Sequence, residues 1–292
     1  MRKWRNAGWV DNMHRFAEGK VVAFLTQHGK ETLVAPLLEP LLGCRIQRAR
    51  GYNTDQLGTF SGDTPRLQSQ IETARKKARI GMDLLGVRIG MGSEGAFVAD
   101  PFGGLLPWNI EVVVWCDDAQ GLEVTGVAQG PARSLYRGVR KFSELELFAQ
   151  EAGFPEHHLL LRPDSETDPR MVKGLADWQS LRKAFIECHS ASTHGLVFAE
   201  NDHRAFCSPS RQAMIVRATQ DLMKKFSALC PACALPGFAI TAQKAGLTCR
   251  ACGGTTRLPM SYILQCHACQ HTQEKQSDMR WADPRDCDVC NP

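Results

Sequence analysis

Runs of hydrophobic residues alternate with amphipathic segments along most of the chain, and these patterns predict strands and helices in turn. Residues 21–25 and 110–116 are continuous apolar runs of the kind found in buried strands. Residues 122–127 form another strand candidate, which would pair with 110–116 as a hairpin. The remaining strand candidates are 87–91, 158–162 and 196–199. Strands that alternate with helices in this way predict an α/β domain with a mixed sheet.

The predicted helices are marked by their cap residues. Thr64 and Pro65 are residue types typical of an N-cap and a first helical position. The helix that they open would end at Gly81 or Gly86, because glycine commonly follows the last helical turn. The other predicted helices are 143–152, which begins with a capping box, 175–188 and 208–228.

Three stretches near these elements are expected to be irregular. Pro36 and Pro40 each lack a backbone N–H, so residues 33–38 are expected to hold only short helical pieces. The polar residues 26–31 and the glycine-rich residues 92–95 each follow a predicted strand, so both are expected to be turns.

The composition is that of an ordinary globular protein, with 43% hydrophobic and 23% charged residues among 292. Residues 1–19 have no clear period and are expected to form an irregular arm. The basic N-terminus is not followed by an apolar segment, and no apolar run approaches the ~18 residues that span a bilayer. We therefore expect a cytoplasmic protein without a membrane partner.

Eight of the twelve cysteines lie near the end of the chain in four Cys-x-x-Cys pairs. Two such pairs can present four thiolates to one ion, and this spacing predicts two structural Zn²⁺ sites. The alternative, a disulfide framework, requires a secreted protein. We therefore expect an α/β domain at 1–226, followed by a small double zinc ribbon at 227–292. The predicted ligands are Cys230, Cys233, Cys249, Cys252, Cys266, Cys269, Cys287 and Cys290.

The spacing of the cysteine pairs leaves their partners open. In one arrangement the two inner pairs share an ion and the two outer pairs share the other. In a second arrangement each pair joins the next along the chain, and the spacing does not separate these two. Crossed pairing, in which the first joins the third and the second joins the fourth, is less favoured.

The net charge of +4 invites a nucleic-acid interpretation, but the metal changes the balance. Eight thiolates and two Zn²⁺ ions together cancel the excess of +4. The ribbon itself has nearly equal numbers of basic and acidic residues, which is not the electrostatic footprint of a DNA-binding surface. Nucleic acid is therefore a less favoured partner than a small molecule.

A second group of residues favours phosphate chemistry. A lysine-bearing turn follows one strand, a basic helix comes next, and a carboxylate between glycines follows another strand. Basic groups hold phosphate oxygens, and carboxylates hold Mg²⁺ or activate water. The commoner explanation is a solvated helix face with two ordinary turns. The candidate phosphate-binding residues are Lys30, Arg75, Lys76 and Lys77, and the candidate catalytic residues are Glu31 and Glu94.

The order of these motifs resembles the inosine-triphosphate pyrophosphatase group over about residues 20–128. The counterparts of its motifs are Thr26–Glu31, Thr73–Ala78 and Ser93–Gly95. The resemblance implies Mg²⁺-dependent hydrolysis of nucleoside triphosphates. This chain has Thr73 where the group has asparagine, and only Glu94 where many members have paired aspartates. A lysine and an acidic residue are therefore the functional positions that carry over.

The chain as a whole also resembles a bacterial family of unknown function that joins an α/β domain to a cysteine-rich tail. The segments that carry this resemblance are Gly92–Phe97, Glu200–Ala205, Cys230–Cys233 and Cys287–Pro292. This resemblance supports the two-part architecture and implies no activity.

Polar residues also gather between a predicted strand and the start of a helix, at Asp202, His203, Arg204 and Arg211. The amino end of a helix can bind anions, although a salt-bridged corner between Asp202 and an arginine is the favoured explanation. Our leading hypothesis is a Mg²⁺-dependent hydrolase of a nucleotide or other phosphate compound, similar to a nucleoside-triphosphate pyrophosphatase. The alternative is a non-catalytic zinc-ribbon module that docks a protein or nucleic acid.

Overall fold

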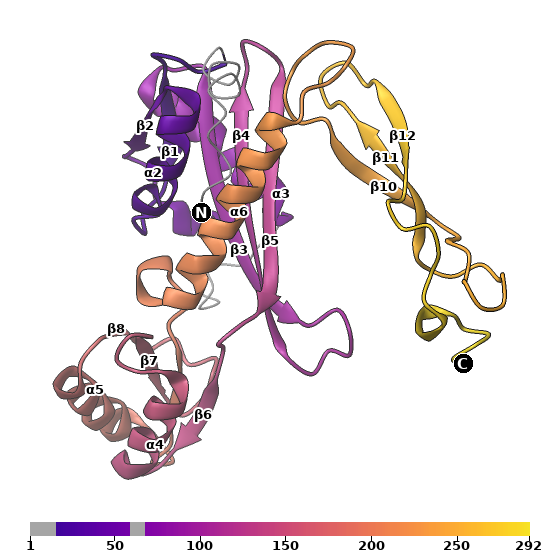
Figure 1. Ribbon diagram of the computed structural model, residues 1–292. Helices are drawn as coiled ribbons and strands as arrows, with labels where there is room; N and C mark the ends of the chain where they lie inside the picture. Colours follow the sequence, from indigo (N-terminus) through magenta and orange to yellow (C-terminus); the bar gives the residue numbers. More distant parts are fainter. Residues whose placement is uncertain (1–15, 59–67) are drawn as a thin grey trace. The chain divides into compact units, whose positions relative to one another are not determined.

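The structure is a computed structural model that describes residues 16–58 and 68–292 (Figure 1). The chain divides into two compact units, one made of Met1–Cys116 with Thr125–Met223 and the other of Asp117–Val124 with Lys224–Pro292. The first unit contains two sheets and the second contains a three-stranded sheet with all eight paired cysteines. The expected class, a mixed α/β fold with a C-terminal cysteine-rich region, is confirmed.

The larger sheet of the first unit has five strands, and its first three are parallel. Strand β1 (Val21–Leu25) pairs in parallel with β2 (Arg45–Ala49) on one side and with β3 (Ile89–Ala99) on the other. Three of the predicted strands are confirmed as β1, β4 and β5. Strand β2 was not predicted, because its sequence is largely polar and only Ile46 and Ala49 are buried. In sheet order the strands are β2 (Arg45–Ala49), β1 (Val21–Leu25), β3 (Ile89–Ala99), β4 (Pro107–Asp117) and β5 (Leu122–Pro131).

The glycine-rich residues 92–95 lie inside β3, so the prediction of a turn there is wrong. Helix α3 (Gln70–Leu85) packs directly on this strand. A Cβ on Gly92 would collide with the carbonyl oxygen of Ala74, and one on Gly90 would lie 2.5 Å from the Met82 side chain. The glycines therefore let the helix backbone approach the strand closely. Glu94 is the next residue on the same strand face.

The first residue of α3 is Gln70, and its N-cap is Ser69, whose hydroxyl accepts a hydrogen bond from the Glu72 amide. The Glu72 carboxylate accepts one in return from the Ser69 amide at 2.9 Å, which completes a capping box. The predicted helix start at Thr64 and Pro65 lies outside the described residues. Gly86 ends the helix in the left-handed conformation. It is one of the two glycines at which the sequence predicted the helix to end.

Helix α2 (Glu31–Leu42) is continuous, although the two prolines predicted only short helical pieces. Val34, Leu38 and Leu42 recur every four residues and are fully buried. Burial of this apolar face stabilises a helix that its own backbone hydrogen bonds support poorly. Tertiary packing thus outweighs the local effect of Pro36 and Pro40.

The second sheet of the first unit is antiparallel, with the order β6–β9–β7–β8. Buried side chains from this sheet and from α4 and α5 form one core cluster, which includes Phe148, Leu161 and Leu181. Strand β8 was not predicted, and the helix predicted to begin at residue 175 begins at Trp178. The elements are β6 (Tyr136–Val139), α4 (Phe142–Ala152), β7 (Leu159–Pro163), β8 (Val172–Leu175), α5 (Trp178–Ala191) and β9 (Val197–Asn201).

Helix α6 (Pro209–Ser227) packs on the five-stranded sheet at β5 and β3. A Cβ on Gly126 of β5 would collide with the backbone of Ala218 in the helix. A Cβ on Gly95 of β3 would lie 2.7 Å from the side chain of Arg211, at the start of α6. Gly95 and Gly92 have opposite parity along β3, so α6 and α3 cover opposite faces of the sheet.

The second unit is built on an antiparallel sheet of β10 (Ala239–Ala245), β11 (Pro259–Gln265) and β12 (Thr272–Gln276). Most residues of these strands are exposed or half-buried. Its small core cluster consists of Cys230, Phe238 and Cys266. Such a core is too small to stabilise a fold without a metal or a cross-link. Within the described residues, no helix is long and apolar enough to cross a membrane.

Candidate functional site

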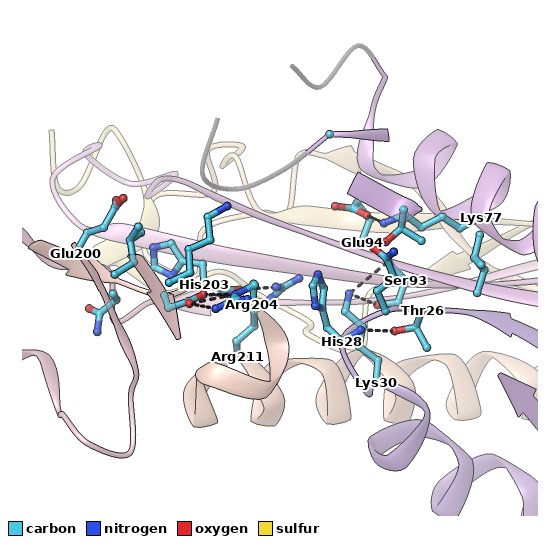
Figure 2. Close-up of a pocket in the computed structure, with 18 residues that line it drawn as sticks. Thr26, His28, Lys30, Lys77, Ser93, Glu94, Glu200, His203, Arg204 and Arg211 are labelled. Atoms are coloured by element: carbon cyan, nitrogen blue, oxygen red, sulfur yellow. Dashed lines mark hydrogen bonds and ion pairs between the residues drawn. The ribbon is translucent and has the colours of Figure 1, made fainter. Parts of the chain in front are cut away.

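A pocket in the first unit lies where β1 ends and brings together side chains from both sheets (Figure 2). Its empty space measures about 840 Å³ and is partly open to solvent. The residues that follow β1, among them Thr26, His28 and Lys30, form one part of the lining. Ligand crevices commonly form at the carboxyl ends of parallel strands. The position of this pocket therefore agrees with that of a binding site.

The lining carries more positive than negative side chains. Five cationic side chains face three carboxylates, so the pocket has a positive balance that attracts anions. The cationic residues are Lys30, Lys77, Lys173, Arg204 and Arg211, and the acidic residues are Glu94, Glu200 and Asp202.

Lys30 is a buried cation, with 5% of its surface exposed. Its Nζ donates to the carbonyl oxygen of Ser93 at 3.3 Å and to the Ser93 hydroxyl at 3.2 Å. Burial lowers the pKa of Lys30 to about 7, and the positive charge of Arg211 adds to this effect. Protonated and neutral Lys30 are therefore both populated near pH 7.

The lowered pKa of Lys30 means that this residue opposes folding while it is protonated. Between the folded pKa of about 7 and the unfolded value of 10.5, the unfolded chain binds more protons, so stability rises with pH in that window. We expect Lys30→Met to stabilise the unliganded protein by roughly 2 kcal/mol at pH 7, after the loss of two hydrogen bonds. Thermal melts from pH 6 to 10.5 should show this gain shrinking as the pH rises. A gain that is constant across the range would contradict the prediction.

Lys77 and Glu94 form an ion pair inside the pocket. The Lys77 Nζ lies 2.5 Å from the Glu94 carboxylate, and the exposed fractions of the two side chains are 11% and 7%. Lys77 comes from α3 and Glu94 from the β3 face that α3 covers, so the glycine-mediated packing of these elements forms the contact. Figure 2 shows this pair beside the Lys30–Ser93 contact.

Arg211 is anchored by a buried carboxylate. Its Nε lies 2.6 Å from Glu111, and both side chains are almost completely buried. Its Nη1 donates to the carbonyl oxygen of His203 at 2.5 Å. A Cβ on Gly95 would collide with the Glu111 carboxylate, so glycine is required where β3 passes this pair. The guanidinium is therefore a fixed positive charge of the pocket.

Asp202 and Arg204 form the salt-bridged corner that the sequence favoured. The Arg204 Nη2 lies 2.5 Å from Asp202, and this carboxylate also accepts the Gly174 amide. His203 stacks on Phe97 with the ring centroids 3.9 Å apart. Burial, reinforced by Arg211, lowers the pKa of His203 to about 4, so this imidazole is neutral at pH 7.

The structure separates the residues that the sequence grouped as one phosphate site. Lys30, Lys77 and Glu94 line the pocket. Lys76 is exposed, Arg75 is half-buried, and neither lines the pocket. Glu31 is also outside the lining, where it pairs with Arg48 at 3.4 Å. The helical period explains this result, because only every third or fourth residue of α3 can face the strand.

The pocket also contains residues that the sequence assigned to a different cluster or did not single out. Arg204 and Arg211, which were treated as a separate anion site, line the same pocket as Lys30. Lys173 comes from β8, which was not predicted, and Glu200 from β9, just beyond the strand predicted at 196–199. Ser93 lay inside a quoted motif, but its contact with Lys30, 63 positions away in the chain, left no local signal.

The pocket carboxylates do not form a ready Mg²⁺ site. Across the described residues, the groups of three or more metal-binding side chains are the two cysteine groups. Glu94 is paired with Lys77, Asp202 with Arg204, and Glu200 with Arg162 at 3.2 Å. Each pocket carboxylate is therefore already engaged by a cation, which competes with Mg²⁺ for its oxygens.

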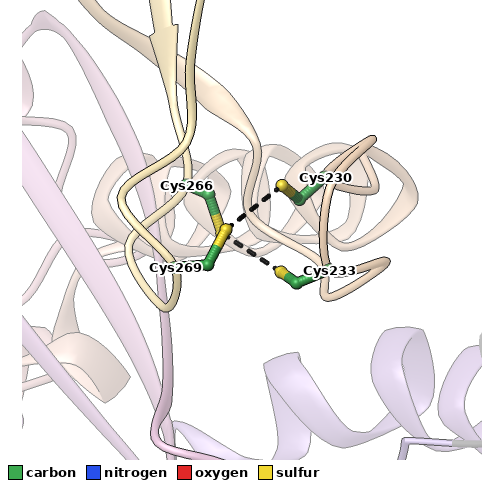
Figure 3. Close-up of side chains that lie close together, drawn as sticks. All are labelled: Cys230, Cys233, Cys266 and Cys269. Carbon is green, nitrogen blue, oxygen red and sulfur yellow. Dashed lines mark hydrogen bonds between the residues drawn. The ribbon is translucent and has the colours of Figure 1, made fainter.

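The eight cysteines of the second unit form two groups of four, each of which could hold a metal ion. In the first group, Figure 3 shows the Cys266 and Cys269 sulfurs facing those of Cys230 and Cys233. Within each group, Sγ atoms from different Cys-x-x-Cys pairs lie 3.6 to 3.9 Å apart. A tetrahedron with Zn–S bonds of 2.3 Å has an edge of about 3.8 Å, so both groups fit Zn²⁺. The second group consists of Cys249, Cys252, Cys287 and Cys290.

The pairing of the cysteine pairs is crossed, which is the arrangement that the spacing favoured least. The first pair shares a site with the third and the second with the fourth. Sheet register explains this result. Ala239, at the start of β10, lies opposite Gln265 at the end of β11, so the pairs that flank these two residues meet at one end of the sheet. Strand β12 then returns the chain to the opposite end, where the other two pairs meet.

Backbone amides point at sulfur within both groups. The Ala232 amide donates to the Cys230 sulfur and the Gly254 amide to the Cys252 sulfur, both at 3.4 Å. Amides of Cys252 and Ala251 lower the pKa of the Cys249 thiol to about 7. These contacts favour the thiolate form that a metal ion requires.

Most basic residues of the ribbon are already neutralised by acidic neighbours. Each of five cations lies within 3.4 Å of a carboxylate, and Arg280 lies over the Trp281 ring at 5.7 Å. The five ion pairs are Lys244–Glu274, Arg250–Asp283, Arg257–Asp288, Lys275–Asp278 and Arg285–Asp283.

A family model described as a domain of unknown function (DUF6671) matches residues 77–292. The match covers more than half of the chain, and the protein therefore belongs to this family. The matched region includes Lys77, Glu94, Arg211 and both cysteine groups, while Lys30 precedes it. No curated protein and no solved structure matches the chain.

Proposed function

We propose that this member of the DUF6671 family binds a phosphate-bearing small molecule in the pocket of its first unit. The observation that carries the proposal is the convergence of five basic side chains on one pocket with only three carboxylates, with Lys30 charged only in part near pH 7. Lys30 and Arg211 are buried, and a buried charge acts on a ligand through a lower dielectric than an exposed one. An anion with several negative oxygens suits such a lining better than a neutral ligand does.

Hydrolysis of the bound phosphate compound is a narrower proposal. Glu94 is the predicted catalytic carboxylate that lines the pocket, and a ligand that takes Lys77 for its own phosphate would release it. The released carboxylate could then accept a proton from water. Because the carboxylates do not form a magnesium site as they stand, the proposal includes no metal-bound step.

We also propose that the two cysteine groups hold structural Zn²⁺ ions and that the protein works in a reducing compartment such as the cytosol. The Sγ–Sγ distances and the all-cysteine shells support closed, structural sites. Docking of nucleic acid by the ribbon has less support, because its cations are mostly paired with acids. A phosphate backbone would have to compete with those carboxylates.

We expect the protein to bind pyrophosphate or a nucleoside triphosphate, and Lys77→Met to weaken this binding about tenfold or more, because a cation of the pocket is lost. Calorimetry at low salt measures the affinity, and phosphate release from the same ligands with and without Mg²⁺ tests hydrolysis. Lys76→Met is the matched control, since Lys76 is adjacent in sequence and exposed. The proposal fails if no anion binds, or if the two variants lose affinity equally.

A further inference from the structure

Lys30 and Ser93 face each other as an amine and a hydroxyl in the wall of the pocket. The Lys30 Nζ lies 3.2 Å from the Ser93 Oγ, which is hydrogen-bond distance, and both residues line the pocket. The same Nζ lies 3.3 Å from the Ser93 carbonyl oxygen, so two contacts fix the amine at this serine. Figure 2 shows both contacts as dashed lines. A nucleophile beside a base that is itself held in place is the arrangement of nucleophilic catalysis.

We propose that Ser93 and Lys30 form a Ser–Lys dyad that cleaves an ester or another activated acyl compound carrying a negative charge. Ser93 is the nucleophile and Lys30 its general base. The charged part of the substrate rests on the proposed function, because the same cationic lining would hold it. The dyad itself rests on the contact between the two residues.

The surroundings of Lys30 favour the neutral amine that a general base requires. The amine is buried, and the charges of Arg211 and Lys77 lower its pKa. The carboxylates of Glu111 and Glu94 act in the opposite direction, and the result is a pKa of about 7. A base that titrates near neutral pH is well matched to proton transfer from a hydroxyl.

The reaction balances without any further reactant except water. The Ser93 Oγ bonds to the acyl carbon while its proton passes to the Lys30 Nζ, and a tetrahedral oxyanion forms. The oxyanion collapses, the bond to the leaving group breaks, and the Lys30 ammonium gives its proton to that group. Water then attacks the acyl-serine, gives a proton to Lys30, and releases the carboxylic acid as Ser93 regains its hydrogen. The net change is hydrolysis of one acyl bond.

The pocket also supplies positive charge for the oxyanion. Lys77 and Arg211 line it together with the dyad, and both are held by carboxylates, Glu94 and Glu111. Fixed positive charge in a partly buried site stabilises a negative transition state without reorganisation. The alternative role of the Lys30–Ser93 contact is a cross-link between the start of α2 and β3, which would leave Ser93 inert.

The test is covalent labelling with a fluorophosphonate probe, followed by peptide mass spectrometry. We expect the label on Ser93, its loss in Ser93→Ala, and labelling at least 100-fold slower in Lys30→Met. Lys76→Met is the matched control and should label at the wild-type rate. Hydrolysis of a nitrophenyl ester with a carboxylate-bearing acyl chain should follow the same order and exceed that of nitrophenyl acetate.

The wild-type protein provides a readout that does not depend on a variant folding. Its labelling rate should rise with pH through about 7, as Lys30 loses its proton. A folded wild type that shows no label on Ser93 between pH 6 and 9 overturns the dyad. Calorimetry with pyrophosphate on Ser93→Ala separates the two proposals, because anion binding can persist without the dyad and labelling can occur without phosphate binding.

Discussion

Replacing Cys266 with serine is expected to remove one of the two proposed metal ions and to destabilise the second unit. This residue is fully buried and is part of the small core cluster of that unit. Structural Zn²⁺ contributes ~10 kcal/mol or more to the folding of small domains. The three strands of the unit carry few buried apolar side chains that could offset such a loss. The metal content should fall from two ions per chain to one, and limited proteolysis should cut within 230–292.

Double substitutions provide a direct test of the crossed pairing. Cys230→Ser with Cys266→Ser damages one site, whereas Cys230→Ser with Cys249→Ser damages both. If each pair joined the next along the chain, Cys230→Ser with Cys249→Ser would damage only one site. If the two inner pairs shared one ion and the two outer pairs the other, Cys230→Ser with Cys266→Ser would damage both sites. Cys44→Ala is the control, because Cys44 is a buried thiol outside both groups. A metal content near zero in wild type purified under reducing conditions would falsify the zinc proposal.

The members of the two cysteine groups were predictable from the sequence, whereas the pairing within them was not. Cys-x-x-Cys is a local motif whose geometry depends on a single turn, so the eight cysteines carry the signal themselves. Which pairs meet depends on how many strands lie between them. Two intervening strands, β10 and β11, bring the first and third pairs to the same end of the sheet. Strand β10 is largely exposed, and its sequence gave little indication of a strand.

The pocket was predictable only in pieces. Lys30 and Glu94 were identified because each was predicted to follow a strand, and Lys77 because it lies in a basic helix between them. That Arg204 and Arg211 line the same pocket depends on tertiary structure, since they lie more than 100 residues further along the chain. The burial that lowers the pKa of Lys30 likewise has no sequence signature.

Glycine and proline misled the prediction in two places for the same reason. Both residue types signal turns when only local conformation is considered. In β3 the glycines are instead required by the close approach of α3, and in α2 the prolines are tolerated because the apolar face is buried. In both places, burial of a packed surface outweighs the local conformational preference of the residue.

Replacing Arg211 with methionine is expected to destabilise the first unit by about 3–5 kcal/mol, because it leaves the Glu111 carboxylate buried without its ion pair. Glu111 has no exposed surface, and its contact with the Arg211 Nε is 2.6 Å. Denaturant or thermal unfolding measures the loss. Arg204→Met is the comparison and should cost less, because 29% of that side chain is exposed and the Asp202 carboxylate keeps hydrogen bonds from the amides of Gly174 and residue 204. A loss below that of Arg204→Met would contradict the argument.

Glu111→Gln combined with Arg211→Met separates the two roles of Arg211. Removing both charges should recover much of the lost stability, because no charge is left buried alone. Anion binding should not recover, since the guanidinium is then still missing from the pocket lining. A double variant that regains stability but not affinity assigns the Glu111 contact to folding and the Arg211 charge to the ligand. If affinity returns with stability, Arg211 acts on the pocket only through the fold, and the remaining four cations must bind the anion.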